Sequence, residues 1–180
     1  MPIDINDSEW NCTLEPSEIA IKSSCPLALR LGMRLIRGFS QSHADLITDV
    51  RGDHRFRSLD DFAKRTRLNQ SVIVRLSQAD CFASLGQNRR KALWEALGQE
   101  RSASNLPLFQ NLPAEDDSQI ELPPMESSED VFADYDSTGL SLKAHPVSFY
   151  RSELDQISVR KGEGWCPVSS PSFPTPHRRR

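Results

Sequence analysis

The sequence predicts a mostly α-helical protein with a short extended segment at its N-terminus, an acidic proline-rich linker and a disordered C-terminal tail. Three observations predict this class. Apolar residues recur at helical spacing between residues 26 and 101. The pattern stops at residues 102–126, where prolines and acidic residues gather. Residues 158–180 show no apolar periodicity, and we expect this tail to be non-native.

Charge follows the same division of the chain. The net charge is −3, but it is −4 in the extended segment 1–25 and +6 in the helical domain 26–101. It is −9 over the linker and a helical connector at 127–157, and +4 in the tail. A basic, well-patterned block between acidic segments indicates that the block binds a polyanion. The alternative is an ordinary solvated helical surface with a mild excess of arginine.

The first elements are short. Residues 2–10 alternate apolar and polar side chains and predict a strand, with residues 12–15 as its pairing partner. Residues 27–36 fit a short strand or turn through Leu31, followed by a helix that reaches Arg37.

Four clearer helices follow, and their apolar spacing predicts the ranges 38–51, 57–67, 69–79 and 88–100. Ser40 or Ser42 would cap the first helix, and Ser58 would cap the second, three residues before Asp61. In the last helix the spacing points four apolar side chains inward: Ala92, Leu93, Ala96 and Leu97. We expect Phe82 and Trp94 to pack in the core and not to stack on bases.

The connector contains two further short helices. The first, at 127–140, would begin at a cap formed by Ser127 or Ser128 and end before Gly139. The second follows a turn at residues 145–146.

Two units with the same predicted helix–short turn–helix order occur at 30–51 and 69–98. A tight turn with small residues can expose the backbone N–H groups at the start of its second helix, and these groups hold a phosphate. Such a contact grips the duplex backbone without reading its sequence. Because each turn lacks a second glycine, a plain helical bundle remains the alternative. The predicted phosphate-contacting residues are Arg34, Arg37, Gly38 and Ser40 in the first unit, and Gly86, Asn88, Arg89 and Arg90 in the second.

The sequence gives no support for metal binding, membrane insertion or secretion. The four cysteines (Cys12, Cys25, Cys81 and Cys166) are scattered and form no zinc-binding pattern, so no metal site is predicted. No apolar run approaches the roughly 20 residues of a membrane helix. The N-terminus is acidic and polar, unlike a signal peptide, so we expect a cytoplasmic protein without membrane contact.

Six stretches occur in the order found in one family: "PIDINDSEWNCTLE", "LALRLGMRLIRGF", "SLDDFAKRT", "LSQADCFASLGQNRRKALW", "LPLF" and "DYDSTGLSLKAHPVSFYR". Over residues 2–157 the chain resembles the C-terminal third of bacterial error-prone DNA polymerases, which are relatives of the DNA polymerase III alpha subunit. The resemblance implies the end of the fingers, a tandem helix-hairpin-helix domain and the connector to an OB-fold. After residue 157 the OB-fold strands do not follow.

The resemblance also implies what this chain lacks. In the family, paired aspartates of the palm hold two Mg²⁺ ions for phosphoryl transfer, and the palm would lie upstream of Pro2. Asp60-Asp61 resembles a helix first turn, and Asp116-Asp117 a solvated linker. We therefore predict no catalytic residue and no cofactor in this chain, with Mg²⁺ expected only in the absent palm.

The resulting prediction is sequence-independent binding of duplex DNA by a fragment of an error-prone, translesion polymerase of the DNA-damage response that cannot polymerise DNA alone. Three alternatives stay open. In the first, the chain is the tail of a gene product whose other part carries catalysis. In the second, it is a helical module that binds proteins. In the third, it is a degenerate remnant without independent activity. Besides DNA, the expected partners are the sliding clamp and translesion accessory proteins.

A clamp contact has its own candidate peptide. "NLPLF" resembles the short peptides that dock into the hydrophobic cleft of the bacterial sliding clamp, with Leu106, Leu108 and Phe109 as anchors. The alternative is an apolar patch that packs on the helical domain. If the peptide docks, purified clamp retains the wild-type chain in a pull-down and loses the Phe109→Ala variant. Equal retention of both chains, or of neither, excludes clamp docking.

Overall fold

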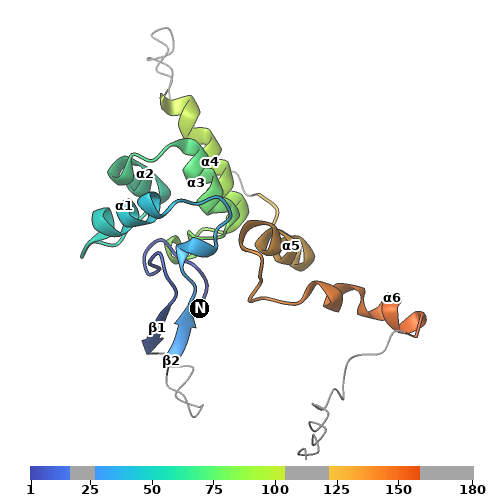
Figure 1. Cartoon of the computed structure of the whole chain (residues 1–180). Helices are drawn as coiled ribbons and strands as arrows, with labels where there is room; N and C mark the ends of the chain where they lie inside the picture. Colours follow the sequence, from blue (N-terminus) through green and yellow to red (C-terminus); the bar gives the residue numbers. More distant parts are fainter. Residues whose placement is uncertain (17–26, 104–121, 159–180) are drawn as a thin grey trace, which may run out of the picture. The chain divides into compact units, whose positions relative to one another are not determined.

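The computed structural model describes residues 1–16, 27–103 and 122–158. The described helices confirm the mostly α-helical class; they are α1 (Gln41–Arg51), α2 (Leu59–Thr66), α3 (Gln70–Gln78), α4 (Arg89–Ala103), α5 (Ser127–Thr138) and α6 (Arg151–Gln156). Short 3-10 helices are η2 (Met33–Leu35), η3 (Ala83–Leu85) and η5 (Pro146–Tyr150). Figure 1 shows α3 and α4 side by side, with α1 and α2 on one side of them and α5 on the other.

The strands pair differently from the prediction. β1 (Thr13–Pro16) pairs antiparallel with β2 (Leu27–Arg30), with Leu14 opposite Leu29. The predicted pairing of residues 12–15 with 2–10 is therefore wrong. Residues 2–10 instead make backbone hydrogen bonds to later parts of the chain, such as the bond from Ile5 N to Cys81 O at 3.0 Å.

The predicted helix up to Arg37 is also wrong, because only the 3-10 turn η2 forms there. A longer helix does not form because the N–H of Arg37 donates to Ser137 O, at 2.8 Å, and not to Met33 O. Before the turn, the N–H groups of Met33 and Arg34 donate to the carbonyls of Glu9 and Trp10, at 2.8 and 3.0 Å. Gly32 permits this contact, since an added Cβ would lie 2.3 Å from the carbonyl carbon of Asn11. The close approach of two backbones thus replaces helical hydrogen bonding.

Two of the three helix caps that the sequence predicted are confirmed. The hydroxyl of Ser40 accepts from the N–H of His43, and that of Ser58 accepts from the N–H of Asp61. The prediction that Ser127 or Ser128 caps α5 is wrong. Glu126 is the N-cap residue, in a reciprocal capping box with the side chain and backbone of Glu129.

One hydrophobic core joins the N-terminal segment to α1–α4. Ile3 and Ile5 are buried in it, as is Phe82, which confirms the prediction for Phe82. The prediction for Trp94 and Leu97 is wrong, since they are 45% and 51% exposed. The prediction for Ala92 and Ala96 is confirmed, and these two small buried residues allow α4 to approach its neighbours closely.

Buried polar groups fix the N-terminal segment in place. The amide of Asn6 donates to Phe56 O and to Ser84 Oγ, at 3.1 and 2.9 Å, while its Oδ1 accepts from Phe56 N at 2.8 Å. The carboxylate of Asp4 accepts from Ser84 N and from Ser84 Oγ, at 2.9 and 2.7 Å. These bonds tie the segment both to the α1–α2 loop and to the turn before α4.

The chain divides into two compact units, Met1–Pro146 and Val147–Arg180. The first unit holds the segment predicted as 1–25, the domain predicted as 26–101 and part of the predicted connector, because Ile3, Ile5 and α5 pack against the helical domain. Within the second unit, Arg151 and Asp155 pair across one turn of α6 at 2.7 Å. The predicted tail lies outside the described residues after Ser158, as do linker residues 104–121 with the clamp-like peptide. No described helix has the length and hydropathy needed to cross a membrane.

We predict that Asn6→Ala lowers the free energy of unfolding by about 2–4 kcal/mol, because it leaves the buried N–H and C=O of Phe56 without their partner. Urea denaturation followed by circular dichroism measures this loss. The control is Asn11→Ala, whose exposed side chain accepts one hydrogen bond from Arg34, and which should change stability by less than about 0.5 kcal/mol. Equal losses in the two variants would contradict the anchoring role of Asn6.

Candidate nucleic-acid interface

The first hairpin turn lies between η2 and α1. Gly38 has φ +66°, a left-handed conformation that favours glycine, and the atoms nearest to an added Cβ there would be those of the Arg75 guanidinium, at 3.6–3.8 Å. The carbonyl of Gly38 accepts a hydrogen bond from Arg75 Nη1. Ser40 uses its hydroxyl as the cap of α1, whereas Arg37 is exposed at the edge of the turn. Arg34 is also exposed and donates to Asn11 Oδ1 at 3.2 Å.

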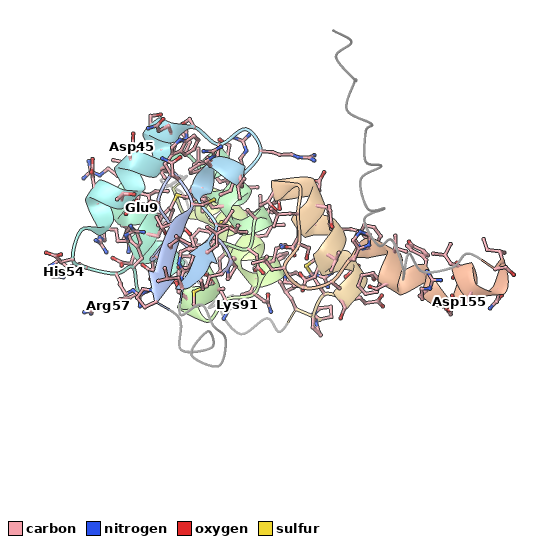
Figure 2. The ribbon with its side chains drawn as sticks, turned by 60° about the horizontal axis from the view of Figure 1, so that its bottom comes forward. Glu9, Asp45, His54, Arg57, Lys91 and Asp155 are labelled. Atoms are coloured by element: carbon pink, nitrogen blue, oxygen red, sulfur yellow. The ribbon has the colours of Figure 1, made fainter. Side chains whose placement is uncertain are left out.

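The second hairpin turn runs through η3 to the start of α4. Gly86 has φ +70° and open space around its Cβ position, so ligand atoms can approach the backbone there. Asn88 Oδ1 accepts from the backbone N–H of Lys91 at 2.8 Å, which makes Asn88 the cap of α4. Lys91 is exposed near the start of α4 (Figure 2).

Both turns contribute to a single pocket of about 440 Å³. Its lining includes four arginines: Arg37, Arg75, Arg89 and Arg90. Arg37 and Arg89 are 52 positions apart in the sequence, and the packing of α3 between the two turns brings them together. Of the eight residues that the sequence predicted as phosphate contacts, Arg37, Arg89 and Arg90 therefore line one pocket. The other five do not line it: Arg34, Gly38, Ser40, Gly86 and Asn88.

Sequence reasoning missed Arg75. It lies in α3, between the buried residues Ile73 and Leu76, and the first-unit prediction stopped at residue 51. Helical spacing indicates that Arg75 faces away from the core. Spacing does not predict that Arg75 contacts Gly38 and lines the pocket, because these contacts depend on the tertiary packing of α3 beside the first turn.

Arg89 has an environment that its sequence position does not indicate. Its side chain is only 5% exposed and pairs with Asp130, at 3.2 Å, and with Asp134, both from α5. Asp80 lies 4.0 Å away, at the turn after α3. A cation in the first turn of a helix opposes the helix dipole, and here the carboxylates of α5 offset that unfavourable position.

The neighbouring cations also contact acidic groups. Arg90 donates to the carbonyl of Pro123 at 2.8 Å and pairs with Glu129 at 3.2 Å, while its side chain remains 34% exposed. Lys143, beyond α5, reaches Asp80 at 3.1 Å and Asp130 at 3.4 Å. The cations near the second hairpin thus pair with carboxylates of α5 and of the turn after α3.

Cys81 is buried just before the second turn, where its carbonyl accepts from Ile5 N. Burial raises the pKa of the Cys81 thiol well above its ordinary value, and the nearby carboxylates of Asp4 and Asp80 add to the effect. The thiol therefore stays protonated at neutral pH and packs as an apolar group. In the ranges that the structure describes, no group of three or more potential ligands among His, Cys, Asp and Glu is arranged to hold a metal ion.

Two turns that each lead into a helix, joined by a shared core, are the features of a helix-hairpin-helix protein. The helix-hairpin-helix motif family matches residues 1–92, and the chain belongs to this family. The match includes the N-terminal segment, consistent with its burial in the same core.

Proteins similar in sequence to most of this chain are error-prone DNA polymerases of several bacteria. The chain is 38% identical to the error-prone DNA polymerase of Methylococcus capsulatus over 93% of its own length, and 39% identical to that of Rhodopirellula baltica over 89%. It is 41% identical to the error-prone DNA polymerase of Mesorhizobium japonicum over 87% of its length. It spans only 14–17% of the length of these relatives. The resemblance seen in the sequence motifs is thereby confirmed.

Proposed function

We propose that this chain binds the phosphate backbone of duplex DNA without sequence preference, as a non-catalytic part of an error-prone DNA polymerase. The observation that carries the proposal is the pocket that Arg37 and Arg75 share with the start of α4, in a chain of the helix-hairpin-helix family.

The chemistry of the pocket suits phosphate. Guanidinium groups donate several hydrogen bonds in a fixed plane and match phosphate oxygens well. Arg37 is exposed and Arg90 is one-third exposed, so both can reach a ligand. The N-terminal turn of α4 adds backbone N–H groups and the positive end of its dipole. None of these groups distinguishes one base from another, which supports binding to any duplex sequence.

In this proposal the pocket contacts DNA and takes no part in the polymerase chemistry. Our proposal assigns catalysis, and the Mg²⁺ that it needs, to a palm domain outside this chain, and the relatives' much greater length is consistent with that division. A cytoplasmic location, a role in translesion synthesis and the clamp contact through residues 105–109 belong to the same proposal.

We predict that the chain binds unrelated duplexes with equal affinity, and that log Kd rises linearly with log salt concentration. The slope should be about 0.9 per phosphate contacted, because each contact releases counterions. Fluorescence anisotropy with two labelled duplexes at several salt concentrations gives both quantities. Arg37→Ala should weaken binding to both duplexes and reduce the slope by about 0.9.

The control is Arg57→Ala, which removes the same charge from an exposed side chain. Arg57 lies just before α2, on the side of the unit away from α5, and does not line the pocket (Figure 2). It should leave the slope unchanged. A wild-type affinity that does not depend on salt would contradict phosphate binding, and equal effects of the two variants would contradict the pocket as its site.

A further inference from the structure

The acidic helix α5 contacts the cations on which the proposed DNA site depends. It carries Glu129, Asp130, Asp134 and Asp136 and no basic residue. Asp130 and Asp134 pair with Arg89, and Glu129 pairs with Arg90. The carboxylates therefore satisfy the two arginines of the second hairpin, as the oxygens of a phosphate would.

Polar contacts, and not apolar burial, hold most of α5 in place. Val131 is the one fully buried hydrophobic side chain in α5, and it lies outside the main core cluster. Its polar attachments include the ion pairs, a hydrogen bond from Arg89 Nη1 to Asp130 O at 2.9 Å and a backbone hydrogen bond from Arg37 N to Ser137 O at 2.8 Å. Helices α1–α3 each bury two or three residues of the shared core, so α5 can separate at a lower cost than any of these three helices.

Arg89 is also incompletely satisfied while α5 is docked. Its Nε atom is buried and has no hydrogen-bond partner among the described residues. A guanidinium has five N–H donors, and leaving one buried and unpaired is unfavourable. Arg89 therefore keeps one N–H donor that its present partners in α5 do not use.

We propose that α5 is an intramolecular competitor of DNA, whose carboxylates occupy Arg89 and Arg90 and lower the affinity of the hairpin site for phosphate. This inference rests on the proposed DNA binding. DNA and α5 then exclude one another at the second hairpin, so releasing α5 increases the affinity and binding DNA weakens the docking of α5.

Asp134→Asn tests the competition because it removes one of the two α5 carboxylates that pair with Arg89 and keeps the shape of the side chain. We expect this variant to bind duplex DNA about tenfold more tightly than wild type at low salt. The matched control is Asp136→Asn in the same helix. Asp136 lines the same pocket but pairs with no cation in the part of the chain that the structure describes, so its variant should bind within about threefold of wild type.

Hydrogen exchange of the full wild-type chain gives a second measurement that needs no variant. Saturation with duplex should speed the exchange of α5 amides while those of α3 stay protected. Circular dichroism verifies that both variants fold; if Asp134→Asn does not, the exchange experiment decides. The competition is overturned if α5 exchange stays unchanged or slows on saturation.

The duplex affinities of wild type and the two variants distinguish a failure of the competition from a failure of the proposed DNA binding. If wild type binds DNA and the two asparagine variants bind equally well, the competition is wrong and the DNA-binding function stands. If no chain binds, including Asp134→Asn, both are wrong.

Discussion

The buried guanidinium of Arg89 is the interaction on which the arrangement around the site depends. A charge with so little exposure is stable only when it is paired, and removal of the partners of such a charge costs about 3–5 kcal/mol. Asp130 and Asp134 supply the partners and thereby fix α5 against the start of α4. Asp80 and Lys143 extend the network to the turn after α3 and to the residues beyond α5. One residue thus connects the second hairpin, the acidic helix and the wall of the pocket.

The rest of the unit serves to hold two distant turns in one geometry. The N-terminal segment is bound to the second turn by Asp4 and to the α1–α2 loop by Asn6. On the other side, Arg75 donates to the carbonyl of Gly38 and ties α3 to the first turn. Because both turns are anchored to the same core, the backbone of the proposed phosphate site is already in place, and little conformational entropy of the two turns would be lost on binding.

Most local features were predictable from the sequence, although the cap of α5 was placed one or two residues too late, and long-range contacts were not predictable. The caps at Ser40 and Ser58 and the left-handed glycines of both turns follow from rules that act within a few residues. The partner of β1, the short turn at η2 and the exposure of Trp94 depend on segments far away in the chain. At the site, helical spacing indicates that Arg89 begins α4, but its burial depends on carboxylates that lie 41 and 45 positions later.

The central claim is that the two turns form one phosphate-binding site. An NMR titration of the ¹⁵N-labelled chain with a short duplex at low salt tests it most directly, since each backbone amide reports separately. We expect the amide of Arg37 in the first turn and those of Arg89 and Arg90 in the second, all three of which line the pocket, to shift together and to fit a single Kd. Shifts that are confined to one turn, or two sets of shifts with different affinities, would contradict a shared site.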